Sequence, residues 1–189
     1  MSLIGLDEIK KRILDDLLVQ DLGERDLLIP EGCGVDLRLG AVFEITQGGA
    51  FIESDGKAGQ GLRKGVTTKE IIKYNPNSTT QDYITIKPGD YYLIQTIETV
   101  NTPPDLMPMV YPRSSLFRAG LHLLKSKTDP GYQGKLIMGI TNLSKFDVKL
   151  QMGARICNMV FYKIDGKTVH YRGQHQGGRV TPEKEERQV

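Results

Sequence analysis

Short runs whose polarity alternates at every second residue constrain the fold of this chain more than any other feature. In residues 35–45, apolar side chains occupy every second position, which is typical of a strand with one buried face. Similar strand-like runs follow at residues 83–86, 91–100, 107–111, 135–142, 148–150 and 155–164. Turn signals such as Lys87-Pro88-Gly89-Asp90 separate them. Many short strands without alternating helices predict a mainly antiparallel β-sandwich or barrel.

Three further segments interrupt or flank these runs. Apolar residues recur at helical spacing over residues 7–20, and Gly23 follows, so we expect one N-terminal helix there. Residues 48–65 are rich in glycine and charge, which predicts a long exposed excursion or hairpin. Residues 165–189 are polar, glycine-rich and charged. We therefore expect one β domain over residues 1–164 and a flexible C-terminal arm over residues 165–189.

Size, charge and cysteine content exclude several classes of protein. A chain of 189 residues suits a single domain. Its net charge of +2 is too small to hold a nucleic-acid polymer through its phosphates, although a small anion could bind locally. Without a long apolar run or a signal-peptide pattern, we expect a cytoplasmic protein that makes no membrane contact. Cys33 and Cys157 share no short spacing and predict two reduced thiols.

The segment from Tyr111 to Leu121 has the residue types that bind a polyphosphate. Arginines offer forked donors to phosphate oxygens, serine hydroxyls donate from short stems, and the first turn of a helix adds free backbone N–H groups. The segment supplies all three in the order Pro112-Arg113-Ser114-Ser115-Leu116-Phe117-Arg118. Two serines before an apolar residue are also an ordinary helix cap. The residues alone therefore leave phosphate binding and simple capping as alternatives.

Five motifs in order resemble the family that joins trimeric dUTP pyrophosphatases with dCTP deaminases. The resemblance runs through most of the chain. The motifs are Gly34-Val35-Asp36-Leu37-Arg38-Leu39-Gly40, Pro112-Arg113-Ser114-Ser115-Leu116, Asp129-Pro130-Gly131-Tyr132-Gln133-Gly134, Gly153-Ala154-Arg155-Ile156-Cys157-Asn158-Met159 and Tyr171-Arg172-Gly173-Gln174. The third motif has the form found in deaminases.

The resemblance implies a dUTPase-like β-barrel or distorted jelly-roll, a homotrimer, and sites built at subunit boundaries. It also implies a role for each matched position. Asp129 would lie beside the deoxyribose and the reacting water, and Tyr132 would pack against the sugar. The sequence does not give the selectivity between uracil and cytosine, which backbone groups usually determine, and residues 123–127 are the place to look for it. The other substrate-binding residues would be Arg113, Ser114, Ser115 and Arg118 at the phosphates, Asn158 where the family usually has glutamine, and Tyr171 and Gln174 in the closing arm.

One position departs from the deaminases of this family. They carry a glutamate ten residues after the aspartate of the third motif, and this chain has Gly139 there, on a strand without any carboxylate. Deamination needs a group that activates water and protonates ammonia. The sequence also lacks the motifs of the zinc deaminases. This reasoning favours a dUTP pyrophosphatase that forms dUMP and pyrophosphate, with Asp129 holding the water and Mg²⁺ bound through the substrate phosphates rather than by protein ligands.

Two alternatives remain beside that prediction. The chain could be a dCTP deaminase that forms dUTP and ammonia through a replacement for the missing glutamate. It could also be a non-catalytic nucleotide-binding or regulatory protein that kept the fold and the phosphate clamp. At the residue level, Asp129 could simply begin a tight Asp-Pro-Gly turn, and Asp36 could bond to backbone or to Arg38 as a structural part of the first motif.

Overall fold

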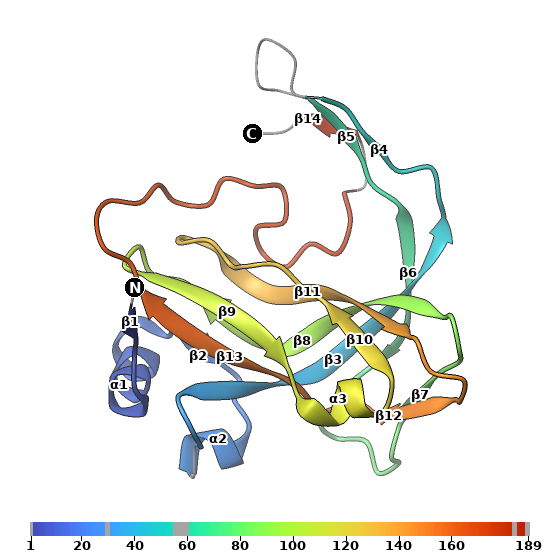
Figure 1. The fold of residues 1–189 in the computed structure, drawn as a ribbon, viewed down its shortest axis with the longest axis horizontal. Coiled ribbons are helices and arrows are strands. Elements are labelled where there is room, and N and C mark those ends of the chain that lie inside the picture. Colours follow the sequence, from blue (N-terminus) through green and yellow to red (C-terminus); the bar gives the residue numbers. More distant parts are fainter. Residues whose placement is uncertain (1, 29–30, 55–60, 183–184, 188–189) are drawn as a thin grey trace.

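A strongly curled antiparallel sheet forms the body of the protein (Figure 1). The computed structural model describes residues 2–28, 31–54, 61–182 and 185–187. The backbone of the sheet follows the order β1-β13-β3-β8-β11-β10, with β2 beside β8, β6 beside β3 and β9 beside β13. Their bounds are β1 Ser2–Leu3, β2 Val19–Gln20, β3 Gly34–Gln47, β6 Thr67–Lys73, β8 Tyr91–Asn101, β9 Leu106–Pro112, β10 Leu121–Leu124, β11 Gln133–Asn142 and β13 Arg155–Lys163. The expectation of a mainly β, barrel-like fold is confirmed.

Smaller elements complete the fold. β7 (Tyr83–Ile86) pairs with β12 (Val148–Gln151), and β14 (Glu186–Arg187), β5 (Leu62–Lys64) and β4 (Phe51–Ile52) form a small sheet that stands away from the body at the top of Figure 1. The predicted excursion over residues 48–65 thus contains the paired strands β4 and β5, while its residues 55–60 lie outside the described part of the chain. No helix in the described residues is long and apolar enough to cross a membrane.

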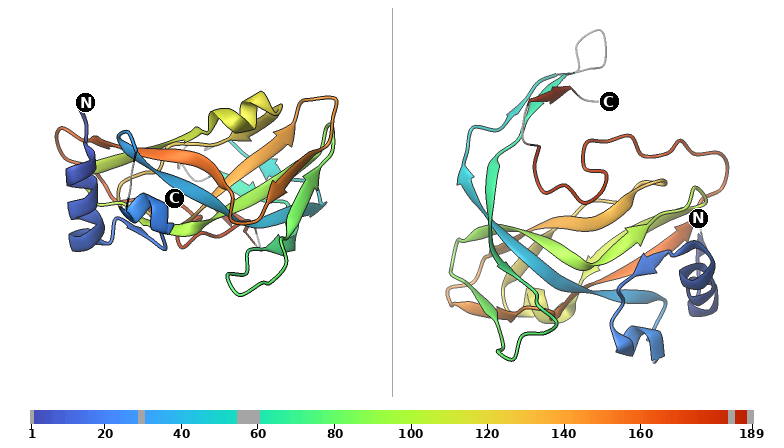
Figure 2. Two further views of the ribbon diagram at one scale, coloured as in Figure 1. Left: turned by 90° about the horizontal axis from the view of Figure 1, so that it is seen from below. Right: turned by 180° about the vertical axis from the view of Figure 1, so that it is seen from behind.

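The helices are shorter than the sequence pattern suggests. α1 spans Leu6–Asp16 and not residues 7–20, because Leu17 adopts a left-handed conformation (φ 52°) that ends the helix. Leu18 is then fully buried, and the chain continues as β2 against β8. The short helix α2 (Glu24–Leu28) was not expected, whereas α3 (Ser114–Arg118) lies where the sequence indicated the first turn of a helix. Figure 2 shows α1 at one end of the sheet and α3 far from it.

β3 is buried on both faces over most of its length, which differs from the single buried face predicted by its alternation. The sheet curls around β3. β13 pairs with its residues 34–38, β8 with residues 39–43 and β6 with residues 41–47. Gly40 permits this crowding, since a Cβ there would lie 2.6 Å from the carbonyl oxygen of Thr96. Fully buried Leu37, Leu39 and Val42 pack into the single hydrophobic core that the described residues form.

The C-terminal arm, residues 165–182 of the described chain, lies across β11 (Figures 1 and 2). Backbone hydrogen bonds join Tyr171 N to Pro130 O at 2.6 Å and Gly177 N to Gln133 O at 2.8 Å. The Gln176 side chain donates to Gly131 O at 3.0 Å. The arm thus covers the third motif of its own chain. Its division from the domain over residues 1–164, and its flexibility, stay predictions.

Candidate functional site

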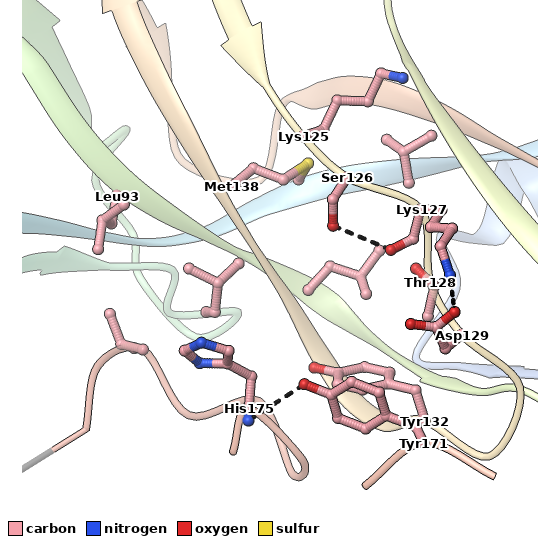
Figure 3. Close-up of a pocket in the computed structure, with 14 residues that line it drawn as sticks. Leu93, Lys125, Ser126, Lys127, Thr128, Asp129, Tyr132, Met138, Tyr171 and His175 are labelled. Carbon is pink, nitrogen blue, oxygen red and sulfur yellow. Dashed lines mark hydrogen bonds and ion pairs between the residues drawn. The ribbon is translucent and has the colours of Figure 1, made fainter. Parts of the chain in front are cut away.

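A first pocket lies between β10–β11 and the arm, and we call it the base pocket because the motif resemblance predicts the sugar and base of a nucleotide here. Its volume is about 280 Å³, near the lower end of the range for small-ligand sites. Asp129, Tyr132 and the arm residues Tyr171 and His175 are among its lining side chains (Figure 3). Leu93, Val110, Lys125, Ser126, Lys127, Thr128, Leu136, Ile137, Met138 and Val180 complete the lining. It combines an apolar floor with a few polar groups, as ligand sites do.

Asp129 stands at the rim of the base pocket. The turn that holds it is closed by the hydrogen bond from Tyr132 N to Asp129 O at 3.2 Å, and Gly131 occupies a position with φ of 82°. Lys127 Nζ contacts Asp129 Oδ1 as an ion pair. Asp129 therefore both begins the expected tight turn and presents a carboxylate to the pocket, so the two readings of this residue are compatible.

Two tyrosines bring the third motif and the arm together. The rings of Tyr132 and Tyr171 meet edge to face, with centroids 5.5 Å apart, an arrangement that aromatic pairs favour. Tyr132 is buried and donates its hydroxyl to Lys135 O at 2.6 Å. Burial, followed by the neighbouring Tyr171, raises the pKa of Tyr132 to about 12. Tyr132 is therefore a neutral hydrogen-bond donor at physiological pH.

His175 is a pocket residue that the sequence reasoning missed. Its imidazole lines the base pocket, on the other side of the tyrosine pair from Asp129 in Figure 3. Its backbone N–H donates to the Tyr171 hydroxyl at 3.4 Å. Asp129 and His175 thus give the base pocket a carboxylate and an imidazole, two kinds of side chain that act as general acids and bases in enzymes. The only sequence signal was that this histidine directly follows the arm motif, which ends at Gln174.

A second pocket is lined by residues of the first, second and fourth motifs. We call it the phosphate pocket, because the sequence analysis predicts phosphate binding by Arg113 and Ser114. It is lined by Arg113 and Ser114, Asp36 and Asn158, and by five residues of an adjoining segment: Arg25, Asp26, Glu31, Gly32 and Cys33. Its volume is about 350 Å³. The two pockets share no lining residue. Within one chain, the base pocket and the phosphate pocket are therefore separate.

The carboxylate of Asp36 holds the polar side chains around the phosphate pocket in position. This carboxylate is buried and accepts hydrogen bonds from Arg113, from Arg155 Nη1 at 2.9 Å and from Asn158 Nδ2 at 3.0 Å.

The pairing of Asp36 with Arg38 that the sequence left open does not occur. Arg38 instead donates to the fully buried Glu98, at 2.7 Å from its Nε and 2.8 Å from its backbone N–H. Burial raises the pKa of Glu98, against the opposing effect of those bonds.

The structure brings together most of the predicted site residues, in two groups. Arg113, Ser114 and Asn158 line the phosphate pocket, and Asp129, Tyr132 and Tyr171 line the base pocket. Ser115 and Arg118 line neither pocket in the described chain; both are exposed on α3, and the Arg118 guanidinium lies over the Phe117 ring. Gln174 lies beside His175 in the arm without lining a pocket. Their roles toward substrate stay predictions.

Gly139 adjoins the base pocket on β11. It pairs with Leu93 of β8, which lines the pocket, and it shares a strand face with the lining residue Ile137. A Cβ at this position would lie 2.6 Å from the Tyr91 hydroxyl oxygen. The space beside residue 139 is therefore taken by the phenol of a neighbouring strand.

Comparison with solved structures identifies the type of fold. The deoxycytidine triphosphate deaminase of Agrobacterium tumefaciens superimposes with a TM-score of 0.59 at 16% identity, over 86% of this chain and 48% of that one. The chain thus spans about half the length of that structure. At this identity the likeness concerns the fold, which is dUTPase-like.

Sequence comparison identifies the family. The model of the dCTP deaminase-like family matches residues 3–164. A protein of Dictyoglomus thermophilum named dUMP-forming dCTP deaminase is 35% identical over 144 residues, covering 73% of this chain and 69% of the relative. Its namesake from a Sulfurihydrogenibium species is 31% identical over 175 residues, covering 92% and 91%. The chain belongs to the dCTP deaminase-like family.

These relatives contradict the preferred activity of the sequence analysis. The prediction of a dUTP pyrophosphatase, favoured over a deaminase because of Gly139, is wrong: the relatives carry the name of dCTP deaminases. The absence of a carboxylate from one strand does not exclude an acid–base group from the pocket. A pocket is lined from several elements, and here the turn before β11 and the C-terminal arm add Asp129 and His175.

Proposed function

We propose that the protein binds deoxycytidine triphosphate and deaminates its base. The observation that carries this proposal is the base pocket, where Asp129 and His175 join an apolar floor in a chain of the dCTP deaminase-like family. Relatives along nearly the whole chain are named dUMP-forming dCTP deaminases. The phosphate pocket, with Arg113 and Ser114, suits the triphosphate.

The chemistry assigned to the base pocket is an exchange of water for ammonia at C4. The water oxygen bonds to C4 while one of its protons passes to a pocket group, and the C4–N bond breaks as that proton reaches the amine. The second water proton ends on N3, so that dCTP and water give dUTP and ammonia. Asp129 orients the water, and His175 is the group that receives and returns the proton.

The proposal includes Mg²⁺ as an ion that the triphosphate of the substrate binds. The described residues contain no group of three or more His, Cys, Asp and Glu side chains suited to a metal ion. In the phosphate pocket, Asp36 is engaged by arginines and Asp26 accepts the Asp36 N–H at 3.1 Å. These carboxylates fit a metal poorly, so the triphosphate oxygens would hold Mg²⁺ and the ion would neutralise part of their charge.

The test incubates the protein with dCTP and Mg²⁺ and measures ammonia and nucleotide products separately, with dUTP in a parallel reaction. Ammonia that appears in step with the loss of dCTP is the expected result. A protein that binds dCTP saturably without releasing ammonia contradicts the proposal. So does one that releases pyrophosphate from dUTP but no ammonia from dCTP.

One observation favours a second candidate, binding without turnover. The β11 residues that line the base pocket are Leu136, Ile137 and Met138, none of which is an acid or a base, and Tyr91 fills the space beside Gly139. A protein of this kind would hold deoxycytidine triphosphate for a regulatory purpose. Saturable binding of dCTP with unchanged nucleotide after long incubation is the result that would select it.

A further inference from the structure

We propose that Arg25 is a triphosphate-binding residue and that Glu31 masks it in the ligand-free protein. Both side chains line the phosphate pocket and lie outside the five sequence motifs. The inference rests on the proposed function only in taking a nucleoside triphosphate as the occupant. It adds an arginine from α2 to the pocket residues of β3, α3 and β13 and to Arg113, which directly precedes α3.

The geometry places Arg25 between the pocket interior and solvent. Its Nη2 forms an ion pair with Glu31 Oε2 at 2.6 Å. Its Nη1 lies 3.8 Å from Asp26 Oδ1 and 3.7 Å from Asp36 Oδ2. Asp36 also holds Arg113, so the guanidiniums of Arg25 and Arg113 approach the same carboxylate oxygen from two elements. Two converging guanidiniums are the arrangement that binds phosphate oxygens.

The charges around this point explain why Glu31 matters. Among the described residues, Arg25, Arg113 and Arg155 contact Asp26, Asp36 and Glu31, so that three positive charges meet three negative ones. Asp26 and Asp36 are buried and fixed by hydrogen bonds, whereas the Glu31 side chain is 82% exposed. Movement of Glu31 alone would leave one positive charge in excess and free the Nη2 donor of Arg25.

Arg25 can pair either with Glu31 or with the phosphate oxygens of a ligand, and the stronger contact is the one that forms. An ion pair with so exposed a carboxylate changes an equilibrium by about fivefold or less. Phosphate oxygens carry more charge and accept from two guanidiniums at once. A triphosphate that enters the pocket therefore displaces Glu31 from Arg25. Asp26 and Asp36 stay in place beneath the arginines.

The test measures binding of dCTP and of inorganic tripolyphosphate by isothermal titration calorimetry. We expect Arg25→Gln to weaken both ligands by about 10- to 100-fold, the usual effect of losing a charge-assisted contact. We expect Glu31→Gln to tighten both by about two- to fivefold. Matched controls change the same charges at exposed positions that do not line the phosphate pocket: Lys10→Gln on α1 and Glu70→Gln on β6.

The pair of variants separates this inference from its alternatives. Unchanged affinity in Arg25→Gln, or weaker binding in Glu31→Gln, overturns it. An effect on tripolyphosphate but not on dCTP also overturns it, because the site would then take a free anion only. Tight dCTP binding by the wild-type protein without ammonia release defeats the proposed function and leaves this inference standing.

Cys33 gives a second readout of occupancy, from a thiol within the phosphate pocket itself. It is exposed and lines the phosphate pocket, whereas Cys157 is buried. A thiol reagent should label Cys33 quickly, and tripolyphosphate or dCTP should slow that labelling. The Glu31→Gln variant should reach half protection at a lower ligand concentration than the wild-type protein. Equal protection curves for the two proteins contradict the masking role of Glu31.

Discussion

At the scale of residues, the buried carboxylate of Asp36 shows how the fold prepares an anion site. Burying a charge costs free energy unless partners compensate, and removing one partner of a buried pair typically costs about 3–5 kcal/mol. Arg113, Arg155 and Asn158 supply that compensation. The arginines are thus held in position before any phosphate arrives, which lowers the entropy lost on binding.

Asp129 provides the first prediction for the proposed reaction. Asp129→Asn keeps the size of the side chain and removes its charge, so ammonia release should fall by about 10²-fold or more while dCTP binding changes little. Steady-state kinetics and calorimetry measure the two effects. Ammonia release within a few-fold of wild type would remove Asp129 from the mechanism, and a misfolded variant would support a purely structural turn.

His175 gives a second prediction, with a matched control in the same arm. His175→Asn should lose about 10²- to 10⁴-fold in ammonia release, and added imidazole should restore part of it because a free base can enter the vacated space. His170→Asn, an exposed arm histidine that does not line the base pocket, should retain activity. Loss in both variants, or the absence of rescue, would indicate a structural role for the arm instead.

The raised pKa of Tyr132 predicts how the stability of the protein depends on pH. Its pKa is raised to about 12 in the folded protein by burial and by Tyr171, whereas a tyrosine in an unfolded chain ionises near about 10. The folded state therefore holds this proton more tightly, and the stability involved is present below pH 10 and lost as pH rises through 12. Urea unfolding measures the free energy of unfolding at pH 9 and at pH 11.5. Between these pH values, Tyr132→Phe should lose less of this free energy than the wild-type protein, by on the order of 2 kcal/mol. An equal loss would contradict the raised pKa.

The site was predictable where neighbouring residues along the chain carry the chemistry. Arg113 and Ser114 follow one another, and both reach the phosphate pocket. Arg25 and Glu31 could not be found in this way, because α2 is a five-residue helix whose place beside β3 depends on tertiary packing. Ser115 and Arg118, also expected at the phosphates, are exposed on α3 and line neither pocket, so their roles stay predictions.

At the scale of elements, strands were predictable wherever the alternating pattern was long. β8, β11 and β13 begin and end within two residues of the expected bounds. β6 was missed because its side chains are mostly exposed and leave a weak apolar pattern, and β10 because four residues are too few to define a period. The helix over residues 7–20 was too long since nothing in its apolar spacing signals the left-handed turn at Leu17.

The contact between the arm and β11 supports a prediction about elements. Gly134 has φ of 143°, and a Cβ there would lie 2.6 Å from the Gly177 carbonyl carbon of the arm. Gly134→Ala should therefore displace the arm and speed proteolysis within residues 165–182. Gly89→Ala is the matched control: its φ of 83° is similarly strained for alanine, but no atom lies within 4 Å of the added Cβ. Equal proteolysis of both variants would assign the effect to backbone strain alone.

At the scale of the whole molecule, the separation of the two pockets is the central fact. One triphosphate cannot use Arg113 and Asp129 together if the base pocket and the phosphate pocket of one chain remain apart, and they share no lining residue. A cyclic assembly resolves this, because each copy then offers its base pocket to the phosphate pocket of a neighbour. We propose the trimer that the family resemblance implies, in which every complete site combines two chains.

Mixing two inactive variants tests this assembly directly. Asp129→Asn disables only base pockets, and Arg113→Gln disables only phosphate pockets, so each homotrimer should be inactive. In trimers reassembled at random from equal amounts, about a quarter of the sites pair an intact base pocket with an intact phosphate pocket of a neighbour, and ammonia release should recover to about that fraction. Light scattering before and after mixing checks that the assembly has three times the 21.1 kDa chain mass. A mixture as inactive as its parents, although subunits have exchanged, would show that each site lies within one chain and that the arm or another segment must bring the two pockets together.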